Sequence, residues 1–369
     1  MTESSLHGQT AAVSRPMRIG IGVGSVDPDD VSFVVDAEAL GADCAWIAEV
    51  WGHDALTRLA FLAAKTSTIK LASGIVQIGA RTPALLAMSA MSLQHLSNGR
   101  FILGVGTSGP QVMEGWHGVR FDSPITATRE TIDIVRMVAR GDRVTYEGKL
   151  YRLPLPGGPG RAMKSMASPV NVPIYVASLG PRNLALTGEL ADGWVGNAFI
   201  PETAEPFLAE LRRGAERGNR SLDDLDLVMP VAVEFTDDFE EAARRHASGY
   251  AFTIGAMGSR DQNFYNAAFS RQGFADDIEA VQTLWFAGKR EEAAARVPLD
   301  LGWKTNLLGT PAMIKERVRL YRAAGITSLQ AKLSGSRQQQ LDTLAQLLDV
   351  VSEVNAEMAN DQTVARTVE

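Results

Sequence analysis

Eight short apolar segments alternate with helical segments along the chain, a rhythm that predicts a TIM (β/α)8 barrel with a helical insertion late in the chain. The apolar segments are continuous rather than alternating, which is typical of parallel strands buried on both faces. With 369 residues, the chain is long enough for one such barrel and an insertion. A doubly wound sheet is the alternative, but it usually has fewer strands.

The strands are predicted from apolar runs that end at glycine or at a polar loop. They cover residues 17–24, 44–48, 69–76, 100–105, 172–177, 192–197, 225–235 and 328–333. Helices are predicted from apolar stripes and from end signals, such as Pro83 at a start and Gly325 after an end. They cover residues 29–41, 55–66, 83–96, 126–140, 181–190, 203–217, a segment from about 238, 310–325 and 338–359.

Two segments interrupt this rhythm. Residues 144–153 alternate around Glu147-Gly148 and predict a hairpin, which a loop rich in proline and glycine follows. Residues from about 250 to 300 predict a helical insertion, in which most aromatic side chains form a core and a minority line a substrate pocket. We expect one domain over residues 17–352, with a flexible tail at 1–16 and a second tail at 353–369.

The charge balance and composition exclude several classes of partner. The chain has 36 basic and 43 acidic residues, a net charge of −7 and no basic run, so nucleic acid is not an expected partner. No apolar stretch is long enough to cross a membrane, and the first fifteen residues lack the apolar core of a secretory signal. Cys44 is the only cysteine, which excludes an intramolecular disulfide and favours the reducing cytoplasm.

Motifs of metalloenzymes and serine hydrolases are missing. No cluster of histidine and carboxylate residues has the spacing of metal ligands, so no metal site is predicted. No G-x-S-x-G turn that would present a nucleophilic serine is found. Catalytic residues are therefore expected at the carboxyl ends of the strands, where the active site of a TIM barrel lies.

Polar residues crowd the loop after the second predicted strand. Glu49, Trp51, His53 and Asp54 lie there, and His117 lies on the loop after the fourth strand. A carboxylate or imidazole at such a place can act as an acid or base or hydrogen-bond a cofactor. Glu49 can equally be a salt-bridge partner, and either histidine can be structural. Asp54 is better explained as the N-cap of the following helix.

Glycine-rich turns follow the fourth and fifth strands. The turn at 104–109 lacks the Rossmann and P-loop spacings, and predicts either close approach of backbone to a flat ring or simply a glycine-lined rim. In the turn at 178–183, Gly180 precedes a helix that starts near Pro181 and has Arg182 in its first turn. Free amides and positive charge at a helix start predict a phosphate cradle; a tight turn without a ligand is the alternative.

Three segments together resemble motifs of the bacterial luciferase-like superfamily of flavin and deazaflavin enzymes. They are residues 97–106 (SNGRFILGVG), 177–184 (ASLGPRNL) and 191–197 (ADGWVGN). Over about residues 17–352 the chain looks most similar to the branch that uses coenzyme F420, which includes methylenetetrahydromethanopterin reductase. The resemblance implies a TIM barrel and hydride transfer between the deazaflavin and a small organic substrate.

The resemblance also implies which residues bind the cofactor. Gly74-Ile75 matches a bulge with a non-proline cis peptide that backs the ring, and Glu49 matches an acidic position near its polar edge. The residues implied to bind the cofactor are Glu49, Gly74, Ile75, Val76, Thr107, Ser108, Gly109, Ser178, Leu179, Gly180, Pro181, Arg182 and Asn197.

The chain departs from its relatives at two positions. Many relatives have an Asp-His pair where this chain has Glu49-Val50, and the sugar-phosphate dehydrogenases have a carboxylate near Gly109. A sugar phosphate or a methanopterin is therefore not the expected substrate. The candidates for the missing proton-transfer groups are Glu49, Trp51, His53, Glu114 and His117.

Three functions are compared. The first is an F420-dependent oxidoreductase; the alternatives are an FMN-dependent monooxygenase of the same superfamily and a barrel that binds a ligand without turnover. A deazaflavin transfers hydride but resists oxygen chemistry, and the segments at 177–184 and 191–197 favour it. The resemblance implies a homodimer. Scarce charge at the strand ends and the aromatic insertion predict an uncharged or apolar small-molecule substrate.

Overall fold

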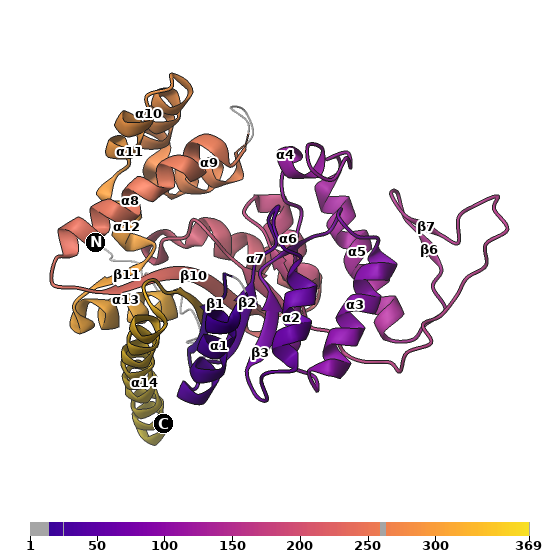
Figure 1. Cartoon of the computed structure of the whole chain (residues 1–369), viewed down its shortest axis with the longest axis horizontal. Helices are drawn as coiled ribbons and strands as arrows, with labels where there is room; N and C mark the ends of the chain where they lie inside the picture. Colours follow the sequence, from indigo (N-terminus) through magenta and orange to yellow (C-terminus); the bar gives the residue numbers. More distant parts are fainter. Residues whose placement is uncertain (1–14, 25, 259–262, 369) are drawn as a thin grey trace, which may run out of the picture.

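The chain folds into a closed barrel of parallel strands, which confirms the predicted fold class (Figure 1). The computed structural model describes residues 15–24, 26–258 and 263–368. Each strand pairs in parallel with the next, and the last pairs with the first to close the ring. In order around the ring the strands are β1 (Arg18–Gly22), β2 (Cys44–Ile47), β3 (Lys70–Ser73), β5 (Phe101–Gly106), β8 (Ile174–Ala177), β9 (Gly193–Val195), β10 (Asp226–Phe235) and β12 (Ser328–Lys332).

Helices surround the barrel and pack against their neighbours in chain order. Several of them start at a proline, as predicted at Pro83. Proline is tolerated there because the first residue of a helix makes no intrahelical hydrogen bond through its amide. These outer helices are α1 (Pro28–Leu40), α2 (Ala55–Ala63), α3 (Pro83–Leu96), α5 (Pro124–Ala139), α6 (Pro181–Leu190), α7 (Glu205–Arg217), α13 (Pro311–Ala323) and α14 (Arg337–Val368). Among the described residues, no helix has the length and apolar character needed to cross a membrane.

A second group of helices fills the connection between β10 and α13. It comprises α8 (Phe239–Ala256), α9 (Phe264–Phe269), the π-helical turn η3 (Ser270–Phe274), α10 (Ala275–Phe286), α11 (Arg290–Arg296), α12 (Leu299–Lys304) and the short strand β11 (Leu307–Gly309). The helix expected from about residue 238 is α8, but it packs against α10, α11 and α12 rather than joining the outer ring. The insertion is therefore longer than predicted, and α13 takes the seventh place around the barrel.

The predicted third strand is interrupted. β3 ends at Ser73, the peptide bond between Gly74 and Ile75 is cis, and the chain resumes as β4 (Val76–Gln77), which pairs with β5. The hydroxyl of Ser73 links this residue to Gly104 of β5. It donates to the carbonyl of Gly104 and accepts from the amide of Gly104, at 2.9 Å each. A Cβ at residue 104 would lie 1.8 Å from the Ser73 carbonyl oxygen, so only glycine fits there.

Other boundaries differ modestly from the predictions. The hairpin is confirmed as β6 (Tyr146–Glu147) and β7 (Arg152–Leu153). The helical turns α4 (Pro110–Met113), η1 (Pro201–Thr203) and η2 (Leu222–Asp224) were not predicted, since segments this short carry no periodicity. The last helix reaches Val368 instead of ending near residue 359. The tail expected from residue 353 is therefore helical up to Val368. Residues 1–14 of the other expected tail lie outside the described residues.

A buried ionic group closes the amino-terminal end of the barrel. Arg18 of β1 pairs with Asp226 of β10 at 2.6 Å, and the hydroxyl of Tyr175 donates to the same carboxylate. Burial by itself would raise the pKa of Asp226, but the hydrogen bond and charge of Arg18 lower it. This end of the barrel is thus filled by structural contacts, which leaves the opposite rim for a site.

Glu38 ties α1 to the turn that leads into β3. Its carboxylate accepts hydrogen bonds from the backbone amides of Ser67, Thr68 and Ile69. Partial burial would raise the pKa of Glu38, but these hydrogen bonds lower it. The ionised form therefore stabilises the folded state.

Glu38→Gln is expected to lower the free energy of unfolding by about 1 kcal/mol at pH 7, because weaker neutral hydrogen bonds replace charged ones at a partly exposed site. The folded-state pKa of Glu38 is the lower one, so the difference should be complete above the unfolded pKa of about 4.3 and disappear as pH falls below it. Urea unfolding at pH 7 and near pH 3 measures this, with the exposed Glu279→Gln in α10 as control. An equal difference at both pH values would contradict the assignment.

Candidate active site

The loops that carry the predicted site residues meet at one rim of the barrel. Because the strands are parallel, the loops after β2, β4, β5, β8 and β9 all leave from the same end. Direct contacts join them: the amide of Glu49 donates to the carbonyl of Ile75 at 3.1 Å, and that of Ile78 donates to Gly106 at 3.0 Å. The loops after β2, β4 and β5 are therefore joined, and those after β8 and β9 lie on the same rim.

The backbone around Gly74 and Ile75 is shaped by glycines. The cis geometry that the resemblance implied for this bond is confirmed. A Cβ at residue 106 would lie 2.9 Å from Cδ1 of Ile75, so glycine lets this side chain lie against β5. The result is an apolar ledge made by Ile75 and by the backbone of β5.

The loop after β5 has an open helix start. Ser108 has a positive φ of 57°, and Gly109 is the N-cap of α4 without any side-chain capping bond. Farther along the same loop, Nε2 of His117 is buried and has no hydrogen-bond partner among the described residues. This loop therefore offers unfilled hydrogen-bonding capacity at the rim.

The turn after β8 has the features of an anion cradle. Gly180 is the N-cap of α6 and makes no side-chain capping bond; a Cβ there would meet nothing within 4 Å. Arg182 is exposed in the first turn, and Oδ1 of Asn183 is buried without a partner. Ser178 is different, since its hydroxyl is buried and hydrogen-bonded to Thr187 at 2.8 Å, which leaves only the neighbouring backbone for a ligand.

Arg271 is a site residue that sequence reasoning missed. It comes from η3 and donates to the carbonyl of Leu179 at 2.5 Å, so the insertion contacts the turn after β8 directly. Within the described part of the chain it has no carboxylate partner, and burial lowers its pKa. Only the fold brings residue 271 beside residue 179, and the sequence gives no signal for this contact.

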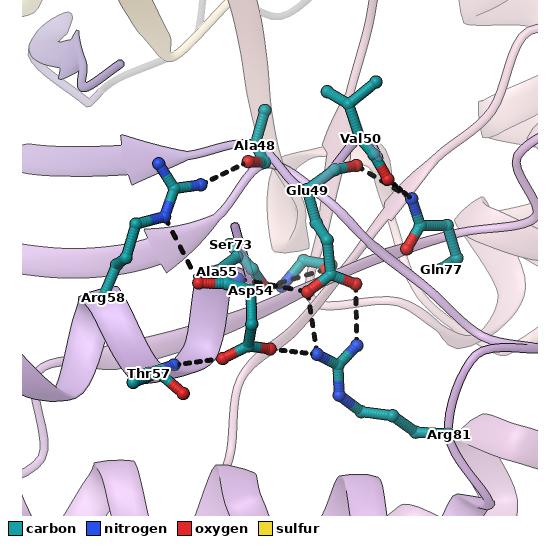
Figure 2. A network of polar contacts seen from close by, with 11 residues as sticks. Ala48, Glu49, Val50, Asp54, Ala55, Thr57, Arg58, Ser73, Gln77 and Arg81 are labelled. Atoms are coloured by element: carbon teal, nitrogen blue, oxygen red, sulfur yellow. Dashed lines mark hydrogen bonds and ion pairs between the residues drawn. The ribbon is translucent and has the colours of Figure 1, made fainter. Parts of the chain in front are cut away.

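Glu49 is held in an ionic cluster rather than free (Figure 2). Both of its carboxylate oxygens accept hydrogen bonds from Arg81, at 2.7 Å each, and one also accepts from the amide of Ala55 at 3.1 Å. Arg81 also contacts Asp54, which accepts from the amide of Thr57 at 2.6 Å and so caps α2 as predicted. The geometry favours the salt-bridge interpretation of Glu49 over a free acid or base.

Gln77 fixes the same loop from the barrel side. Its side chain is buried, and Nε2 donates to the carbonyls of Glu49 at 2.9 Å and Val50 at 3.1 Å. Its Oε1 has no partner among the described residues. Trp51 and His53, in contrast, are exposed to solvent, so neither is held in place by the surrounding protein.

A cavity of about 420 Å³ opens beside these loops, between the ends of β9, β10 and β12 and the insertion. Asn197 contributes to its wall, as do aromatic residues of the insertion, which confirms that a minority of them line a pocket. Two further wall residues, His246 and Lys332, were not predicted. No group of three or more potential metal ligands occurs among the described residues.

Arg81→Met is expected to lower the free energy of unfolding by about 2 kcal/mol, because the carboxylate of Glu49, only 9% exposed, would lose its bidentate partner. The double variant Glu49→Gln/Arg81→Met removes the stranded charge and should recover part of this loss. Denaturant unfolding of the two single variants and the double variant measures the coupling. Strictly additive losses would show that the pair is not coupled.

Comparison with known proteins agrees with this geometry. Residues 22–328 match the family model described as luciferase-like monooxygenase. A Mycobacterium tuberculosis protein that carries the name of a coenzyme F420-dependent oxidoreductase is 36% identical over 342 residues, which cover 89% of this chain and 98% of that protein.

Two methanopterin enzymes are also similar. A 5,10-methylenetetrahydromethanopterin reductase from Archaeoglobus fulgidus is 28% identical, over 81% of this chain and 87% of its own. The solved structure of a coenzyme F420-dependent tetrahydromethanopterin reductase from Methanopyrus kandleri has a TM-score of 0.74 at 24% identity, covering 90% and 98% of the two chains. The chain therefore belongs to the luciferase-like monooxygenase family, on the branch of its F420-dependent oxidoreductases.

Proposed function

We propose that this chain is an oxidoreductase that binds coenzyme F420 and transfers hydride between it and a small organic substrate. The observation that carries the proposal is the presence, on one rim of the barrel, of an open anion cradle at Gly180 and a 420 Å³ pocket lined by apolar and aromatic side chains. The cradle suits the phosphate-bearing tail of the cofactor, and the pocket suits a small organic substrate. The names of the relatives support the same assignment.

The residues at the cradle fit the phosphate of such a cofactor. An uncapped backbone amide at the start of α6 and the exposed guanidinium of Arg182 are available there as hydrogen-bond donors. Leu179 and Gly180 would contribute backbone amides, whereas Pro181 has no amide hydrogen to donate, and Arg271 holds Leu179 in place. No acidic residue lies in the first turn of α6 to oppose an anion.

The ledge beside the cradle fits the ring. Gly74, Ile75 and Val76 would support one face, and the open loop at Thr107, Ser108 and Gly109 would contact its edge. When bound, F420 supplies hydride transfer at a ring carbon and little reactivity with oxygen.

We infer that His117 handles the proton that accompanies hydride transfer. Its Nε2 is buried, unpartnered and on the loop that borders the ledge, whereas His53 and Trp51 are exposed and the oxygens of Glu49 are occupied by Arg81.

Cofactor choice is tested by titrating the purified protein with F420 and with FMN and following tryptophan fluorescence. We expect tight binding of F420 and negligible binding of FMN, because the assignment rests on the deazaflavin-using branch of the family. The reverse preference would overturn the proposal and make oxygen consumption with reduced FMN the next assay.

Arg182→Met is expected to weaken F420 binding by roughly five- to tenfold, the effect of losing one charge-assisted contact at a helix start. The same titration at low and high salt measures it, and the wild-type advantage should shrink as salt screens the charge. Arg152→Met, on the exposed β7 hairpin strand, is the control and should bind as wild type does. Unchanged affinity in Arg182→Met would remove this residue from the cradle.

Two further properties belong to the proposal. We propose a homodimer, as the sequence resemblance implied, and a cytoplasmic location. The latter is supported by the single cysteine, Cys44, which is buried in the barrel and has no second cysteine with which to pair. Sedimentation of the purified protein tests the first property.

A further inference from the structure

The 420 Å³ pocket, which lies beside the proposed cofactor-binding loops, has an unusual distribution of charge. Its apolar wall comes mainly from Phe199, Met229, Tyr250, Phe252 and Tyr265. Among the described residues, no aspartate or glutamate lines it, and Lys332 is the only lysine or arginine that does. A ligand of this pocket therefore meets an apolar surface and one primary amine.

Lys332 is fixed in position by the barrel. It is the last residue of β12, and its register partner on β10 is Ala232. The aliphatic stem passes β1, where a Cβ on Gly22 would lie 4.0 Å from its Cγ. The backbone of Lys332 is thus held by two neighbouring strands. Its side chain is exposed where it borders the pocket.

The amine of Lys332 is unpaired in the part of the chain that the structure describes. Among the described residues it makes no hydrogen bond and no ion pair. Glu234, near the end of the adjoining strand β10, is already bonded to Arg245 and to Nε2 of His246, the latter at 3.1 Å. Burial lowers the pKa of Lys332. An ammonium group in such surroundings gains free energy when an anion arrives beside it.

We propose that Lys332 is the anchor for a carboxylate on the substrate, and that the substrate is an organic acid with an apolar or aromatic body. The apolar wall accepts the body and the amine binds the carboxylate. Asn306 and Thr305 lie in the same wall, but their side chains are already hydrogen-bonded within the protein, which leaves Lys332 as the group that binds the carboxylate. This proposal differs from the expectation of an uncharged substrate. That the bound acid is a substrate rests on the proposed function. That the pocket binds such an acid does not.

The test uses calorimetric titration of the full chain without F420, with matched acids and amides: cinnamate and cinnamamide, and 3-phenylpropanoate and its amide. The wild type is expected to bind at least one acid tenfold or more tightly than its amide. Lys332→Met should abolish that preference while leaving amide binding within about twofold, and Lys332→Arg should retain it. Lys164→Met, in an exposed loop, is the control and should behave as wild type.

A second readout follows the amine directly. Reductive ¹³C-methylation labels lysines for NMR, and the Lys332 signal is assigned by its absence in Lys332→Arg. Addition of the acid should shift this signal and raise its apparent pKa; the amide should do neither. A wild type without any acid preference, or a preference that survives in Lys332→Met, overturns the proposal. Since no F420 is present, failure to bind F420 refutes the proposed function alone.

Discussion

Closure of the barrel between β12 and β1 determines where every loop of the site lies. Once these two strands pair, all strand ends face one rim, and residues as distant in sequence as Gly22, Gly180 and Lys332 lie on the same surface. The opposite end is filled by Arg18, Asp226 and Tyr175, which hold β1, β8 and β10 together. Function at one end thus depends on ionic packing at the other.

The rim divides into two arcs with different chemistry. The arc from β2 to β8 is built from glycine backbone, uncapped helix starts and ion pairs that fix its loops, and this suits a cofactor common to many relatives. The arc from β9 to β12 is built from side chains of the strand ends and the insertion, with one amine among aromatic rings. Arg271 links the arcs, because it reaches from the insertion to the carbonyl of Leu179.

Sequence reasoning captured the barrel because parallel strands, glycine turns and proline starts are local signals. It led to the proposed cofactor arc for the same reason, since residues 177–184 carry their own pattern. It could not decide between the two interpretations of Glu49, because Arg81 lies more than thirty residues away and only folding brings them together. Arg271 and Lys332 were missed for a similar reason. A single cationic residue forms no recognisable sequence motif. Its role becomes visible only when the fold shows that no acidic residue among those described lies beside it.

β10 and β11 hold both ends of the insertion on one strand pair. Val233 pairs with Leu307 and Phe235 with Gly309, so the chain leaves the barrel and returns to it at adjacent positions. Changes of length or sequence between α8 and α12 can be absorbed without shifting the register of the barrel strands, because loop length costs little once the ends are fixed. The insertion can therefore vary in length between β10 and β11 while the barrel register stays fixed, provided that Arg271 in η3 keeps its contact with the turn after β8.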